Sequence, residues 1–305
     1  MNWTIPVYIP YLDKVVKYHP YTNRNQEHII KYCGSEDKIG LLQYFKQMLR
    51  ELCVSDSIEP DNLPVVDQVM MLLRLRSMCS GHEVKLMIPD SDQPEKKPEP
   101  PPPVDDEPPP ITRSDEPVEQ DKPKGITYNV SLLSLQKTIH ENYQPPVTIG
   151  DSNAIQVKVH YPFNWSTVDF QDYISSISVN NNTVTNNKKN KHEIMQLIEH
   201  LPVDILNDIK KAQQIYEKSV QNMIFIETID NSPNIYMDHE YFLDMLITIY
   251  NEEFPNFIEL MYVFVKMMHM PLTDVMSLTP VDTQMYYKAF EKENEEREKA
   301  RKKNN

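Results

Sequence analysis

The stretch Trp3-Thr4-Ile5-Pro6-Val7-Tyr8-Ile9-Pro10-Tyr11-Leu12-Asp13-Lys14-Val15-Val16-Lys17-Tyr18 decides how the fold begins. Apolar residues alternate with other residues over 3–9, and a period of two predicts a β-strand. Pro10 to Asp13 provides a turn, and Lys14 to Tyr18 provides a return strand. Because proline cannot donate to a strand ladder, we expect this hairpin at a sheet edge or in a small isolated sheet.

Helical spacing follows the hairpin. Apolar residues recur at intervals of three and four over 23–33, 38–53 and 64–80, which predicts three helices. Asn23 is the expected cap of the first helix, with Gln26 completing a capping box, and Gly34 is expected to end it. A strand is predicted from Glu83 to Ile88.

The segment from Pro89 to Gly125 differs from the rest in composition. It holds twelve prolines and eleven acidic residues against five basic ones. Such a segment cannot bury enough apolar surface to offset the entropy lost on ordering, so we predict a disordered acidic insert. A spacer is the favoured interpretation. A ligand for a proline-recognising groove is the alternative.

Strands and helices return after the insert. Strands are predicted over 126–130 and 154–161, and helices over 132–139 and 165–177, the last capped by Ser166. The Asn-rich residues 180–191 predict a loop. From there the pattern is helical to the end of the chain, over 192–200, 202–228, 238–251, 255–268 and 280–303.

These elements predict an α+β protein that is mainly α-helical. Its expected parts are an N-terminal hairpin with helices (1–88), the disordered insert (89–125), strands and helices that complete the N-terminal part with a small sheet (126–179), the Asn-rich loop (180–191) and a C-terminal helical bundle (192–305).

Composition limits the function. The 305 residues include 31 basic and 45 acidic side chains, a net charge of −14, which disfavours nucleic-acid binding. Nucleotide-binding glycine motifs and a G-x-S-x-G nucleophile motif are absent from the sequence. No signal peptide or membrane span is expected, and three widely spaced cysteines favour reduced thiols in a cytoplasm.

One short pattern, Cys79-Ser80-Gly81-His82, could hold a metal ion. A structural zinc site needs a second pair of ligands, and the other cysteines and histidines form no matching pair. His28 and Cys33 lie five residues apart, a poor spacing for thiol–imidazole contact on a helix. We therefore expect no metal, no cofactor and no catalysis, with a metal-dependent enzyme built on Cys79 and His82 kept as an alternative.

The last third of the chain is rich in methionine and aromatic residues. Most of them should form a core, but methionine-rich surfaces also suit adaptable binding of a partner. The predicted partner-contact residues are Tyr262, Met268, Met270, Met276, Tyr286 and Tyr287.

Four motifs follow one another along the chain. They are the opening Ile5-Pro6-Val7 through His19-Pro20-Tyr21-Thr22, Leu73-Arg74-Leu75-Arg76-Ser77, His160-Tyr161-Pro162, and the closing Leu272-Thr273-Asp274-Val275 through Pro280 to Tyr287. Their order resembles the T4-type baseplate hub assembly family of phage tails. Some relatives carry paired cysteines where this chain has the acidic insert, so no metal site is carried over.

The resemblance implies a non-enzymatic role in building the hub. The expected partners are other baseplate hub or tape-measure proteins, with no nucleic acid and no membrane span. The expected location is the host cytoplasm during assembly, or the tail baseplate of the virion if the protein stays there. An assembly chaperone would act by covering adhesive surface on a subunit until its neighbour arrives.

Overall fold

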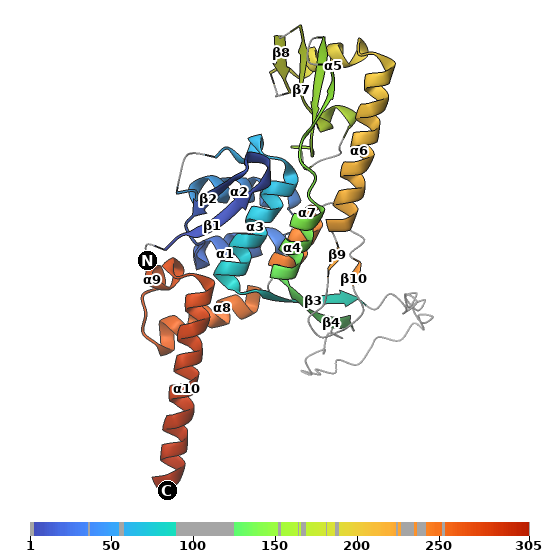
Figure 1. The fold of residues 1–305 in the computed structure, drawn as a ribbon. Helices are drawn as coiled ribbons and strands as arrows, with labels where there is room; N and C mark the ends of the chain where they lie inside the picture. Colours follow the sequence, from blue (N-terminus) through green and yellow to red (C-terminus); the bar gives the residue numbers. More distant parts are fainter. Residues whose placement is uncertain are drawn as a thin grey trace, which may run out of the picture.

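The computed structural model shows a mainly helical α+β fold with small antiparallel sheets, as the sequence predicts (Figure 1). It describes residues 3–304 except 36, 55–57, 90–124, 152–153, 164, 166–168, 181, 187–188, 224, 227–234, 237–241 and 252–253. The described α-helices are α1 (Asn23–Gly34), α2 (Lys38–Glu51), α3 (Val65–Ser80), α4 (Leu132–Asn142), α5 (Lys191–Glu199), α6 (Val203–Met223), α7 (Phe242–Tyr250), α8 (Phe254–Tyr262), α9 (Leu272–Ser277) and α10 (Pro280–Asn304).

The described strands form four sheets. Their bounds are β1 (Ile5–Ile9), β2 (Lys14–Tyr18), β3 (Glu83–Pro89), β4 (Gly125–Ser131), β5 (Val147–Gly150), β6 (Ile155–Val159), β7 (Ile174–Val179), β8 (Asn182–Thr185), β9 (Phe225–Ile226) and β10 (Ile235–Tyr236). Short 3₁₀-helices are η1 (Pro10–Leu12), η2 (Pro60–Asn62) and η3 (Phe170–Tyr173), and η4 (Val263–Met267) is π-helical.

The predicted N-terminal hairpin is confirmed as an isolated two-stranded sheet. β1 pairs antiparallel with β2 from Ile5↔Tyr18 to Ile9↔Lys14, and η1 makes the turn. Alternate residues of β1 are fully buried, because that face of the hairpin packs against α3. The isolation of the sheet agrees with Pro6 in β1 and Pro10 at the start of the turn.

Helix α3 is the centre of the main core. Thirteen of its sixteen residues are buried, since its apolar residues lie on almost every side.

The prediction that Asn23 caps α1 with Gln26 is wrong. Thr22 is the cap and forms the capping box with Asn25, while Asn23 and Gln26 lie inside the helix and are buried. The Asn23 side chain bonds the C-terminal residues instead.

Strands β3 and β4 form a hairpin whose register runs from Glu83↔Ser131 to Pro89↔Gly125. The predicted insert is therefore bounded by two paired residues. Residues 90–124 of the insert lie outside the described part of the chain. The expected disorder therefore stays a prediction.

A four-stranded antiparallel sheet, in the order β5-β6-β7-β8, lies at the far end of α6 (Figure 1). The helix predicted over 165–177 is wrong: η3 and then β7 occupy the described residues of its second half, and the predicted cap Ser166 lies outside them. The Ile174 and Ile177 side chains of β7 are fully buried in the main core of the molecule. The loop predicted over 180–191 is also partly wrong. The chain turns back at Asn180, and β8 then pairs with β7.

The C-terminal third is largely helical, as predicted, apart from the two-residue strands β9 and β10. Helices α5, α6 and α7 contribute to the main core, which draws on residues from Ile5 to Tyr250. A second, smaller core gathers Ile30 with Phe257, Met261, Phe264 and Val275. The predicted division into segments stays a prediction. Among the described residues, no helix combines the length and the apolar content needed to cross a bilayer.

Candidate partner-binding surface

The C-terminal arm, defined here as residues 254–304, docks on α1 through a polar joint. The buried Asn23 side chain donates from Nδ2 to the Val275 carbonyl at 2.7 Å and to Thr283 Oγ1 at 2.6 Å. The Asn23 backbone N–H donates to the Leu278 carbonyl at 2.8 Å. One residue near the start of the chain therefore holds both α9 and the first turn of α10.

The first turn of α10 is fixed by its own cap. Asp282 donates its backbone N–H to Thr279 Oγ1 at 3.1 Å, and the Thr279 hydroxyl donates to Asp282 Oδ2 at 2.7 Å. Pro280 lies at the first helical position, where its missing N–H leaves no helical bond unmade. The sequence pattern predicts this start of the helix correctly.

The arm exposes a group of large apolar side chains, each between 45 and 65% accessible. They lie on α8, η4, α9 and α10: Ile258, Tyr262, Met267, Leu272, Met285 and Tyr286. We call these six residues the apolar surface of the arm.

The structure separates the six predicted contact residues into two groups. Tyr262 and Tyr286 belong to the apolar surface. The other four are partly buried against the second core, namely Met268, Met270, Met276 and Tyr287. Their assignment as contacts remains a prediction, but their packing in the arm gives them a structural role.

The apolar surface includes residues that the sequence analysis missed, Ile258, Met267, Leu272 and Met285. Ile258 and Tyr262 stand four residues apart, so their shared face was visible in the spacing. Met267 was not, because the π-helical turn η4 adds a residue and rotates the following side chains relative to an unbroken α-helix.

A groove of about 280 Å³ runs between η4 and α10. Its apolar lining comes from Val263, Met267, Tyr287 and Phe290. Its polar lining lies further along α10, at Glu291, Asn294, Glu295 and Glu298. A hydrogen bond to Glu291 raises the pKa of Tyr287. The groove is therefore apolar at its base and acidic toward the end of the helix.

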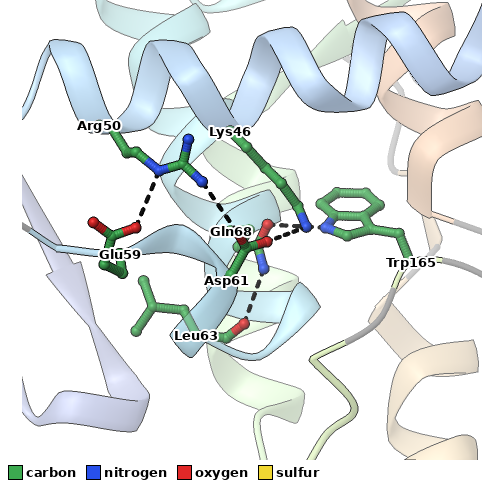
Figure 2. Close-up of polar contacts among 7 residues, drawn as sticks. All are labelled: Lys46, Arg50, Glu59, Asp61, Leu63, Gln68 and Trp165. Carbon is green, nitrogen blue, oxygen red and sulfur yellow. Dashed lines mark hydrogen bonds and ion pairs between the residues drawn. The ribbon is translucent and has the colours of Figure 1, made fainter. Parts of the chain in front are cut away.

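A larger cleft, of about 1010 Å³, lies between the segments η1, α2 and η2 on one side and the four-stranded sheet on the other. Its lining includes Tyr11, Phe163, Lys46, Asp61, Asp172, Lys189 and Lys191. Much of the charge on one wall is already paired (Figure 2): Lys46 forms an ion pair with Asp61, and Arg50 bonds Glu59 and Asp61 at 3.1 Å each. This network fixes η2 against α2.

Gln68 of α3 joins two further residues beside this network (Figure 2). Its amide donates to the Leu63 carbonyl at 2.9 Å and accepts from the Trp165 indole N–H at 2.9 Å. The side chains drawn together here satisfy one another, so the arrangement indicates a rigid wall rather than a set of groups prepared for a reaction.

Two buried ionisable residues meet the hairpin tip behind the cleft. Asp67 accepts from the Tyr11 backbone N–H at 3.0 Å and from the Tyr143 hydroxyl at 3.1 Å. Burial raises the pKa of Asp67 to about 6, although both hydrogen bonds oppose the rise. The His160 ring packs against the Tyr11 ring at 5.8 Å and donates from Nδ1 to the Tyr161 carbonyl. Burial lowers the pKa of His160 to about 4.

The structure places the two residues of the C-x-x-H pattern, Cys79 and His82, in different environments. Cys79 is buried in the last turn of α3, whereas His82 follows Gly81 and is exposed. Burial raises the pKa of the Cys79 thiol to about 12 and that of the Cys33 thiol to about 11, so both are protonated at neutral pH. Within the described ranges, no three His, Cys, Asp or Glu side chains are grouped as metal ligands.

Comparison with known proteins finds a matching family for most of the chain. The family model described as "T4 bacteriophage base plate protein" matches residues 2–224, well over half of the chain. No curated protein and no solved structure shows significant similarity to this chain. The opening, central and His160-Tyr161-Pro162 motifs lie inside the match, while the closing pattern of 272–287 and the whole C-terminal arm lie beyond it. The chain belongs to the T4 bacteriophage base plate protein family.

Proposed function

We propose that this protein is a non-enzymatic assembly factor for the baseplate hub, and that it binds hub or tape-measure subunits through the apolar surface of its C-terminal arm. Family membership gives it a structural or assembly role in a phage baseplate. The choice of hub subunits as partners rests on the motif resemblance and goes beyond the family match.

The exposed apolar surface is the observation that carries the proposal. Sixteen large apolar side chains of the described residues are exposed, and six of them fall within the 29 residues from Ile258 to Tyr286. The other ten are spread from Tyr8 to Ile215. Single exposed apolar residues are ordinary, but a concentration on one arm is typical of a surface that another protein covers.

Coverage of that surface also gives a mechanism. A factor that binds a subunit before its neighbour arrives removes adhesive surface from solution and stabilises the bound form by mass action. The non-enzymatic part of the proposal is supported by the paired charges in the larger cleft and by the protonated thiols. It is tested by metal analysis of protein purified without chelators, because tightly held zinc would revive the alternative at Cys79 and His82.

A structural hub subunit retained in the virion is the second candidate, because the family description fits a lasting component equally well. The test combines capture of the tagged protein from infected cells with mass spectrometry of purified particles. We expect hub or tape-measure proteins in the captured sample and none of the tagged protein in particles. A fixed amount of the tagged protein in particles would favour the structural subunit. No tail protein in the captured sample, together with no tagged protein in particles, would contradict both.

A further inference from the structure

Helix α10 leaves the body of the molecule and ends at the C terminus far from it (Figure 1). From Lys288 to Lys302 its side chains are exposed, except for the partly buried Phe290 and Asn294. A helix that is polar on all sides and has little tertiary contact is marginal in water. It persists through ion pairs along its own surface or through contact with another chain.

The charges of this helix are divided along its length. Residues 291–298 carry five glutamates against Lys292 and Arg297, whereas residues 299–302 carry Lys299, Arg301 and Lys302 with no acid. Two ion pairs within the helix, Glu293–Arg297 at 2.6 Å and Glu295–Lys299 at 3.5 Å, join side chains that are well exposed. Exposed pairs of this kind contribute little, so these groups can exchange partners readily.

The acidic part of α10 also forms one wall of the groove described above. Glu291, Glu295 and Glu298 line it beyond the apolar base made by Met267, Tyr287 and Phe290. Within the same helix, Lys299 pairs with Glu295 of the groove, but the basic end beyond Lys299 continues along the axis away from the body and lies outside the groove (Figure 1). The same end of a second copy can reach it.

We propose that two copies of the chain pair through antiparallel α10 helices, each placing its basic end, Lys299–Lys302, in the groove of the other. The long apolar stems of the basic side chains would lie over Tyr287 and Phe290, with their charged ends against the glutamates. Because each copy supplies the same groove and the same basic end, the contact is two-fold and closes at a dimer. Overlap of residues 288–304 would extend over about 25 Å at 1.5 Å per residue.

The test is analytical ultracentrifugation of the full chain. We expect a mass twice the 35.9 kDa of one chain in dilute salt and a monomer in 1 M salt, where the Debye length falls to about 3 Å. A monomer at every salt and protein concentration would overturn the proposal, as would a dimer that salt does not weaken.

Charge reversal locates the contact. The variant Lys299→Glu/Arg301→Glu/Lys302→Glu should be monomeric, and so should Glu291→Lys/Glu295→Lys/Glu298→Lys. A chain with all six changes keeps the net charge of −14 and regains complementarity, so it should dimerise again. The matched control Lys210→Glu/Lys211→Glu/Lys218→Glu, on the exposed face of α6, should remain dimeric. Failure of the six-fold variant to dimerise while its far-UV circular dichroism is unchanged would contradict the pairing.

Discussion

At the scale of the residue, Asp67 and His160 change the pH dependence of stability in opposite directions, although both contact the same residue. Both contact Tyr11 at the tip of the N-terminal hairpin, Asp67 through the backbone N–H and His160 through the ring. Burial disfavours the charged form of each group, so it raises the pKa of Asp67 and lowers that of His160. Their contributions to the pH dependence of folding therefore oppose each other between pH 4 and 6.

We predict that Asp67→Asn stabilises the protein at pH 7.5 by about 1–3 kcal/mol. The pKa of Asp67 is about 6 in the folded chain against 3.8 ordinarily, so its favourable contribution is complete below pH 3.8 and is lost as the pH rises through 6. Asparagine keeps an acceptor for Tyr11 and removes the buried charge. Urea unfolding from pH 4 to 8 measures the effect, and parallel curves for the variant and the wild type would contradict it.

The variant His160→Asn should show the opposite change. The pKa of His160 is about 4 when folded against 6.5 ordinarily, so its contribution is complete above pH 6.5 and is lost as the pH falls toward 4. Asparagine retains a donor for the Tyr161 carbonyl but cannot take up a proton. We expect up to about 3 kcal/mol less loss of stability between pH 6.5 and 4. The control is His192→Asn, which removes an exposed histidine of α5 in place of the buried one.

The sequence could not indicate either buried group. Asp67 lies in the first turn of a helix, where an exposed acid is common because it complements the helix dipole. Its burial comes from Tyr11 and Tyr143, which are 56 and 76 residues away in the chain. Contacts over such separations leave no local pattern.

At the scale of the element, helices with regular apolar spacing were predicted well and ambiguous segments were not. The spacing of 38–53 and 64–80 located α2 and α3 to within a few residues. Residues 165–177 failed because their apolar residues fit a strand as well as a helix, and pairing of β7 with β6 and β8 decided the outcome. The strand β5 was missed since its four residues give too short a pattern.

The side-chain hydrogen bonds described between α1 and the C-terminal arm come from Asn23, beside the apolar packing of Ile30. We predict that Asn23→Ala loosens the arm, because it removes two hydrogen bonds and leaves the Val275 carbonyl without this donor. Loss of a buried hydrogen bond of this kind costs about 1–3 kcal/mol. Hydrogen exchange with mass spectrometry should show faster exchange over 272–287 and unchanged protection in α3.

The matched control is Asn186→Ala. Asn186 also donates to two carbonyls, of Gln171 at 3.0 Å and Ile174 at 2.8 Å, but it lies beside the four-stranded sheet. Its removal should speed exchange near β7 and β8 and leave the arm protected. Equal effects of the two variants on the arm would mean that Asn23 acts only through general stability.

At the scale of the whole molecule, the body belongs to the baseplate family and the arm extends beyond the family match. Of the six residues predicted to contact a partner, four pack against the second core and two are exposed, and their role as contacts stays a prediction. Side chains that share a helical pattern separate into buried and exposed groups only once α1 and α10 are placed around them. The π-helical turn changed the faces further.

The measurement that tests the central claim most directly is capture of tail proteins from infected cells by two matched variants. One carries Tyr262→Ser, Leu272→Ser and Tyr286→Ser in the apolar surface, all outside the groove between η4 and α10. The other carries Met195→Ser, Val203→Ser and Ile215→Ser, exposed apolar residues on α5 and α6. We predict that the first loses capture of its baseplate partner at least about tenfold, the effect of 1.4 kcal/mol, while the second captures as the wild type does. Equal capture by both variants at equal folding would contradict the claim.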